Sequence, residues 1–182
     1  MAVAASADKA DWGADPRAAV ETIPRSYNFA ADILERNLAA GRGQKPAFID
    51  PRGSWTYGEL AERVDRFGNV LRALGIRCEE RILLALLDTI DWPTAFLGAI
   101  KAGVVPIPVN TLMTEDNYRF MLADSRARVL VVSEALLPKF ANLIASSPDL
   151  MHVIVAGKNA GGHRLFEDLI ANADARSTTA ST

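Results

Sequence analysis

Residues 81–110 have the sequence RILLALLDTIDWPTAFLGAIKAGVVPIPVN, which predicts a strand, a helix and a second strand. The apolar runs 82–87 and 105–109 are rich in branched side chains, as is typical of strands covered on both faces. The intervening segment 92–102 predicts a helix that has Pro93 in its first turn, where a missing amide does no harm. Two strands joined by such a helix run parallel, and the crossover is right-handed.

The same alternation continues toward the C-terminus. Residues 129–132 and 153–155 are further buried strand candidates, and helices are expected at 115–123, 134–146 and 166–173. Strands that alternate with helices through short loops predict an α/β fold, with a mostly parallel sheet and helices on both faces.

The N-terminal side of this unit predicts a helix and a hairpin. Asn28 is a candidate cap for a helix that ends near residue 38, before Gly41. Its expected apolar face consists of Phe29, Ile33, Leu34 and Leu38. Residues 47–50 and 54–56 flank Pro51-Arg52-Gly53, which predicts a short hairpin.

A capping box follows this hairpin. In the sequence TYGE, the Thr56 hydroxyl and the Glu59 carboxylate are spaced to satisfy free amides at a helix start, with Trp55 and Leu60 placed for a hydrophobic staple. The helix should run to Gly75, although a glycine inside it, Gly68, costs about 1 kcal/mol relative to alanine.

Composition excludes several classes of protein. The chain has 182 residues, of which 49% are hydrophobic and 23% charged, and a formal net charge of -2, so neither global disorder nor nucleic-acid binding is expected. Charged residues interrupt the most apolar stretch, 82–109, so no membrane-spanning helix is expected. The single cysteine, Cys78, cannot form an internal disulfide, which favours a cytoplasmic location.

Residues 1–26 are expected to form a mobile leader and residues 27–174 the α/β unit, while 175–182, with nothing to bury, should be a linker.

Two features resemble ligand sites, and we favour a structural interpretation of each. The glycine-rich turn 157–162 lies between a strand and a helix, where phosphate-binding loops occur, but its spacing matches neither a P-loop nor a dinucleotide fingerprint. Asp88 and Asp91 follow a buried strand, where they could hold a ribose or a metal ion. The favoured role for Asp91 is to cap the next helix.

The remaining polar candidates also favour structural roles. Asn110-Thr111 lies at the end of a strand, and Thr114 marks a helix start. No nucleophile motif is present, and Cys78 is interpreted as an incidental thiol. The two histidines, His152 and His163, lie far from Cys78 in sequence and suggest neither a zinc site nor a catalytic triad. We assign the tryptophans to packing: Trp12, Trp55 and Trp92.

Two segments resemble a known family. Residues 55–64, WTYGELAERV, and 96–110, FLGAIKAGVVPIPVN, resemble the first two core motifs of adenylate-forming enzymes, which include acyl-CoA synthetases, luciferases and peptide-synthetase adenylation domains. Within that family, LLDTIDWPTAF at 86–96, NTLMT at 110–114 and DSRAR at 124–128 look most like benzoate-CoA ligases. The resemblance covers about residues 27–174 and implies the first part of the large N-terminal domain of such an enzyme.

The resemblance implies a reaction but no site residue in this chain. The implied parent enzyme converts benzoate, ATP and coenzyme A into benzoyl-CoA, AMP and pyrophosphate, with magnesium neutralising the phosphates. The family's phosphate-binding loop and catalytic lysine fall beyond residue 182, and residues 177–182 contain no glycine that could form that loop. We therefore expect no catalytic, cofactor-binding or metal-binding residue in the chain, no cofactor bound to it alone and no activity from it alone. Its expected partners are the rest of its own polypeptide and, for the parent enzyme, a small aromatic acid.

Two alternatives remain open. The chain could belong to a ligase of the same superfamily that acts on another carboxylic acid, or it could be a stand-alone, non-catalytic α/β binding or interaction module. An exposed apolar face would favour the fragment of a larger enzyme, and a fully polar surface would favour the module.

Overall fold

A five-stranded parallel sheet forms the centre of the structure, a computed structural model that describes residue 24 and residues 26–180. The strand order is β4-β3-β5-β6-β7, and every neighbouring pair is parallel. The strands are β3 (Arg81–Ala85), β4 (Val105–Pro108), β5 (Val129–Ser133), β6 (His152–Ala156) and β7 (Arg164–Leu165). The four strands predicted from apolar runs are confirmed as parallel neighbours, whereas the two-residue edge strand β7 was not predicted.

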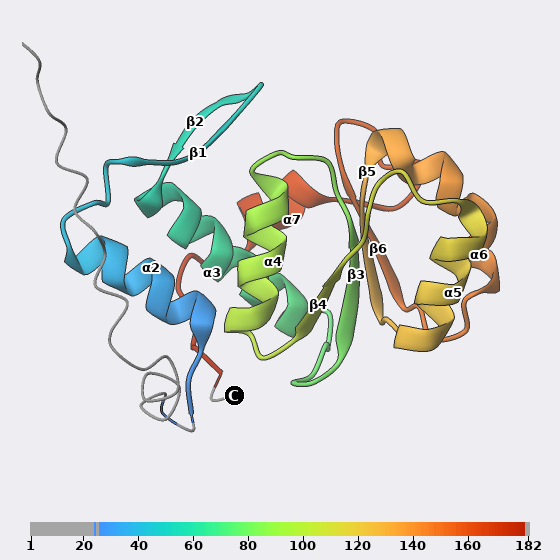
Figure 1. Cartoon of the computed structure of the whole chain (residues 1–182), viewed down its shortest axis with the longest axis horizontal. Helices are drawn as coiled ribbons and strands as arrows, with labels where there is room; N and C mark the ends of the chain where they lie inside the picture. Colours follow the sequence, from blue (N-terminus) through green and yellow to red (C-terminus); the bar gives the residue numbers. More distant parts are fainter. Residues whose placement is uncertain (1–23, 25, 181–182) are drawn as a thin grey trace, which may run out of the picture.

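Helices cover both faces of the sheet, as predicted (Figure 1). One face packs against α3 (Tyr57–Ala73), α4 (Asp91–Lys101) and α7 (Phe166–Asn172), and the other against α5 (Glu115–Ser125) and α6 (Ala141–Ser146). Alternation along β3 explains the two layers, because Ile82 and Leu84 enter the first core and Leu83 and Ala85 enter the second.

The helix predicted over 134–146 is wrong in part. Residues Glu134–Phe140 form a 3-10 helix, η1, and only Ala141–Ser146 is α-helical. Pro138 lies inside η1, and in a regular α-helix its ring would clash with the carbonyl of residue 134. The segment therefore begins with the tighter helix type.

The N-terminal helix α2 (Phe29–Ala39) begins where predicted, but its buried face differs. The Asn28 side chain accepts a hydrogen bond from the amide of Ala31 at 3.1 Å, which confirms the cap. Leu34 is buried together with two alanines, whereas the other members of the expected apolar face, Phe29, Ile33 and Leu38, are exposed. The buried face of α2 therefore consists of Ala30, Ala31 and Leu34.

The predicted hairpin and capping box are both confirmed. Strands β1 (Pro46–Asp50) and β2 (Gly53–Thr56) pair antiparallel, and α3 starts directly after them. The Thr56 hydroxyl accepts from the Glu59 amide at 3.2 Å, and the Glu59 carboxylate accepts from the Thr56 amide at 2.7 Å. Gly75, which follows the helix, has a φ of 77°, a conformation that favours glycine.

The leader expected over residues 1–26 lies almost entirely outside the described residues. Within the part of the chain that is described, none of the helices has the length and apolar character needed to cross a bilayer.

Candidate functional site at the carboxyl edge of the sheet

The parallel strands bring most of the polar candidates to one edge of the sheet. Asp88 and Asp91 follow β3, Asn110 follows β4, Glu134 follows β5 and the turn 157–162 follows β6. Open α/β sheets bind ligands at this edge, so it is the candidate functional site of the chain. A ligand could bind here only through polar groups that have no partner within the chain.

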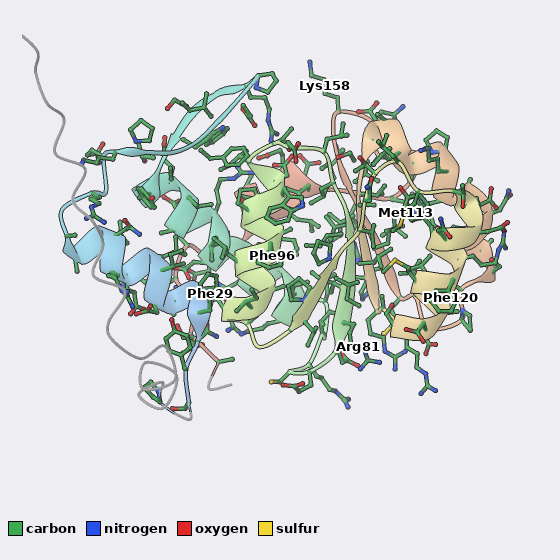
Figure 2. All side chains as sticks on the ribbon, viewed as in Figure 1. Phe29, Arg81, Phe96, Met113, Phe120 and Lys158 are labelled. Atoms are coloured by element: carbon green, nitrogen blue, oxygen red, sulfur yellow. The ribbon has the colours of Figure 1, made fainter. Side chains whose placement is uncertain are left out.

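The glycine-rich turn 157–162 holds a carboxylate of the chain itself. The amides of Lys158 and Asn159 donate to Glu134 Oε2 at 2.7 and 3.1 Å. A Cβ on Gly157 would lie 2.4 Å from the same oxygen, so only glycine allows this approach. These hydrogen bonds lower the pKa of Glu134. The donors that would cradle a phosphate are thus used internally, while the Lys158 side chain projects away from the molecule (Figure 2).

The predicted helix cap by Asp91 is wrong. The residue at the cap position of α4 is Ile90, with helical φ and ψ of -54° and -22°, and no side chain caps the helix. Asp91 is the first helical residue and is 3% exposed. Its two carboxylate oxygens face Arg63 Nη2 at 3.0 Å and Arg52 Nη2 at 2.9 Å.

Asp91 belongs to a group of five charged residues that we call the Asp91 cluster: Asp50, Arg52, Arg63, Asp91 and Glu167. Arg63 connects three helices, because its Nη2 also lies 2.6 Å from Glu167 Oε1 on α7. Arg52, in the hairpin turn, contacts both Asp50 and Asp91. The cluster therefore ties the β1-β2 hairpin to α3, α4 and α7.

Burial and hydrogen bonding act in opposite directions on the pKa values of the three carboxylates of the cluster. Burial alone would raise the pKa of Asp50, but bonds from the Ile90 amide, the Trp55 indole and Arg52 outweigh it and lower the pKa to about 2. Burial raises the pKa of Asp91, and Arg52 opposes the rise. For Glu167, burial acts in the same direction, but hydrogen bonds from Arg63 outweigh it and lower the pKa.

The cluster is internally satisfied, so it offers neither a free base nor a nucleophile. In residues 24 and 26–180, no buried side-chain nitrogen or oxygen lacks a hydrogen-bond partner. The guanidinium of Arg63 also lies 5.1 Å from the centre of the Trp55 ring, a cation–π distance. Such a set of ion pairs positions the surrounding elements, and its buried carboxylates, Asp50 and Asp91, are both paired with arginines.

The other candidates also have structural partners. Asn110 Oδ1 accepts from the Leu112 amide at 2.8 Å, and Thr114 caps α5 as predicted. The Trp92 ring stacks on Phe96 with 5.0 Å between centroids. Asp88 and Cys78 are exposed.

The histidines do not assemble a catalytic or metal site with other candidates. His152 contacts the carbonyl of Leu74 at 3.1 Å through Nε2 and Arg164 Nη1 at 3.0 Å through Nδ1. Over the described range there is no group of three or more His, Cys, Asp or Glu side chains that could hold a metal ion.

Sequence reasoning did not single out Arg52, Arg63 and Glu167, which belong to the Asp91 cluster. It also missed Glu134, which accepts from the amides of the turn 157–162. Arg63 lies 28 residues from Asp91 and 104 from Glu167, so no local spacing connects them. The only available signal was that Arg63 occurs inside the motif WTYGELAERV at 55–64.

Comparison with known proteins identifies one family. A family model described as AMP-binding enzyme matches residues 34–177. Over 136 residues the chain is 57% identical to a benzoate–CoA ligase of Thauera aromatica, a match that covers 74% of this chain and 26% of that protein.

Solved structures of CoA ligases are similar to this chain. A benzoate CoA ligase from Burkholderia xenovorans LB400 superposes with a TM-score of 0.78 and 44% identity, covering 86% of this chain and 30% of that one. An anthranilate CoA ligase in complex with anthranoyl-AMP superposes with a TM-score of 0.82 and 34% identity, covering 89% and 30%. The chain thus spans about a quarter of the length of its curated relatives, 26% and 25% in two cases.

Proposed function

We propose, from the premise that the chain belongs to the family of AMP-binding enzymes, that the protein containing it is an AMP-forming ligase that joins an aromatic acid to coenzyme A. The observation that carries this proposal is the 57% identity to a benzoate–CoA ligase, well above the 29% to an acyl-coenzyme A synthetase of Homo sapiens. Benzoate is the substrate we propose. The reaction forms benzoyl-adenylate and pyrophosphate from benzoate and ATP, after which the thiol of coenzyme A displaces AMP.

The described residues do not fit the nucleotide or its metal ion. The turn amides that could hold a phosphate donate to Glu134, and the described part of the chain offers no metal-ligand group. We therefore derive no catalytic step from these residues. The part we assign to residues 27–174 is structural: a parallel sheet and three helices joined by the Asp91 cluster.

The same reasoning makes the 182-residue chain inactive by itself. Catalysis of adenylate formation requires preorganised donors around the developing charge, and the Lys158 and Asn159 amides of the turn already donate to Glu134. We infer that the missing groups, together with the contacts to ATP, magnesium and coenzyme A, come from the rest of the polypeptide. We propose a cytoplasmic setting for that protein, which fits the one cysteine in these 182 residues.

Two alternatives define what would change the proposal. A ligase of the same family that uses a non-aromatic acid would keep the fold and the reaction but change the substrate. Phe29 and Phe120 are exposed on opposite sides of the molecule (Figure 2), so they do not form one apolar face and do not decide against a stand-alone module. The 57% identity to a benzoate–CoA ligase, of which the chain covers 26%, favours a part of a larger enzyme. We therefore favour the enzyme.

Benzoate-dependent exchange of labelled pyrophosphate into ATP tests the proposal, because it reports the first half-reaction alone. We expect clear exchange by the longer polypeptide encoded by the complete gene and background exchange by the 182-residue chain. Exchange by the 182-residue chain would contradict its assignment as a scaffold, and no exchange by the longer polypeptide with any carboxylic acid would contradict the enzyme assignment.

A further inference from the structure

Residues 173–180, which we call the strap, are held against α3, although the sequence predicted a linker with nothing to bury. Arg66 Nη1 donates to the carbonyl of Ala173 at 2.6 Å. Asn69 Nδ2 donates to the carbonyls of Asp174 and Arg176 at 2.9 and 2.7 Å. Figure 1 shows this segment, in red, passing α3 on its way to the lower end of α4.

The donors come from one face of α3. Residues 66, 69 and 72 are three apart, and side chains at this spacing project from the same side of a helix. Arg72 Nη2 completes the row by donating to the carbonyl of Thr178. Arg72 Nη1 also donates to Asn69 Oδ1 at 3.0 Å, which orients the Asn69 amide group toward the strap.

The far end of the strap is fixed to α4 and α2. The amide of Ala180 donates to the carbonyl of Lys101 at 2.9 Å, and its carbonyl accepts from Asn28 Nδ2 at 3.3 Å. A Cβ on Gly103 would lie 2.9 Å from the Cβ of Ala180, so this end requires small residues on both sides.

One side chain of the strap adds a specific contact. Ser177 Oγ donates to Asp65 Oδ1 at 2.6 Å, and the same oxygen lies 2.6 Å from Lys101 Nζ. The hydroxyl is therefore bonded to an ion pair that joins α3 to α4, and Lys101 in that pair is buried.

We propose that Arg66, Asn69 and Arg72 form a recognition site for the main chain of an extended peptide segment, and that its occupant is the strap itself. The three side chains donate to carbonyl oxygens, which every residue carries, so the site fixes the path of the backbone with little demand on the sequence. Within the strap, the Ser177 hydroxyl bonds to Asp65 and the Asp174 carboxylate accepts from the Arg176 amide, so side-chain identity matters at these positions. The site determines where the polypeptide leaves this α/β unit, and it stands whether or not the protein is a ligase.

Trypsin cleavage of the 182-residue chain after Arg176 tests this site directly. The scissile carbonyl is one that accepts from Asn69, and trypsin cleaves only segments that can leave the surface. The test variant Asn69→Ala removes both donated hydrogen bonds. A second variant, Asn69→Asp, has the same shape and keeps the acceptor for Arg72 but has no amide donor. The matched control is Asn172→Ala, since Asn172 bonds only within α7, to the carbonyl of Asp168.

The readout is the initial rate of cleavage after Arg176 divided by the rate after Arg81, the first residue of β3, which is exposed to trypsin only on global unfolding. This ratio separates release of the strap from loss of the whole fold. Removing two hydrogen bonds should raise it about tenfold in both Asn69 variants, while the control stays within about twofold of the unchanged chain. An unchanged ratio in either Asn69 variant would overturn the proposal. So would an equal rise in the control, or cleavage of the unchanged chain as fast as that of a synthetic peptide spanning residues 172–180.

Discussion

The substitution Asp50→Asn tests the account of how the hairpin is joined to the sheet unit. The Asp50 side chain is fully buried, with 0% of it exposed. Its Oδ1 accepts from the amides of Arg52 and Gly53 and from the Trp55 indole at 2.8, 3.2 and 3.2 Å. Its Oδ2 accepts from the Ile90 amide at 2.9 Å and from Arg52 Nε at 3.3 Å.

The expected loss of stability follows from these bonds. Asparagine has one acceptor oxygen, and its best orientation keeps the three bonds at the Oδ1 position. The amide group then faces two donors, the Ile90 amide and the Arg52 guanidinium, and both bonds are lost. Hydrogen bonds to a charged acceptor contribute about 1.5 kcal/mol each, so the free energy of unfolding should fall by about 3 kcal/mol.

The effect of Asp50→Asn should also depend on pH. The pKa of Asp50 in the folded chain, about 2, is below its ordinary value of 3.8, so the folded state favours the ionised form. A carboxyl group of this kind stabilises the fold fully above pH 3.8 and loses that contribution as the pH falls through about 2. The difference between the two proteins should therefore be constant near pH 7 and shrink toward pH 2.

Urea unfolding followed by circular dichroism at pH 7 and at several values below pH 5 provides the measurement. Asp88→Asn, the same substitution at an exposed position, serves as the control and should change the free energy of unfolding by less than about 0.5 kcal/mol. A loss below about 0.5 kcal/mol for Asp50→Asn at pH 7, or a difference that grows as the pH falls, would refute the reasoning.

Four further substitutions, two of which are compared as a pair, test separate parts of the structure. Thr56→Ala removes the helix cap and should lower the free energy of unfolding by about 1 kcal/mol in urea; no loss would show that the capping box contributes nothing. Gly98→Ala should lower the free energy of unfolding by about 1–3 kcal/mol, because the new Cβ would lie 3.0 Å from Phe67. Gly68→Ala, whose new Cβ has its nearest contact at 3.5 Å, should raise it by up to about 1 kcal/mol. A higher thermal midpoint for Gly98→Ala than for Gly68→Ala would contradict the packing of α3 on α4. Glu134→Ala should speed hydrogen exchange of the Lys158 amide about fivefold, and an unchanged rate would show that the carboxylate does not hold the turn.

Features encoded by neighbouring residues were predictable from the sequence. The capping box depends on Thr56 and Glu59, three positions apart, and the helix forms where that spacing places it. Four of the five parallel strands were recognisable because each is a short apolar run, and β3, β5 and β6 among them are buried on both faces. The observed ends of these strands differ from the predicted ends by at most two residues.

Features that depend on distant partners were not predictable. Asp91 has the residue type and position of a helix cap, and local rules assign it that role. Its side chain turns instead toward Arg63 and Arg52, which come from other elements, because two guanidinium groups compensate a buried carboxylate better than one amide can. The strap was missed for the same reason, since Asn69 and Arg176 lie 107 residues apart.

The same contrast applies to the polar residues at the carboxyl edge of the sheet. Sequence reasoning favoured structural roles for Asp88, Asp91 and the turn 157–162, but it could not identify the partners of these residues because those partners are distant in sequence. In the structure, Asp91 pairs with Arg63, and the amides of the turn 157–162 donate to Glu134. Asp88 is exposed, and among the described residues it belongs to no group of three or more side chains that could hold a metal ion.

The substrate preference of the longer polypeptide tests the central claim most directly. Formation of the CoA thioester, with AMP and pyrophosphate as products, should be measured for benzoate, 2-aminobenzoate and hexanoate under identical conditions and compared as kcat/KM. The account predicts the highest kcat/KM for benzoate and the lowest for hexanoate. A higher kcat/KM for hexanoate than for benzoate would contradict the aromatic-acid assignment, and the absence of AMP among the products would contradict the ligase assignment itself.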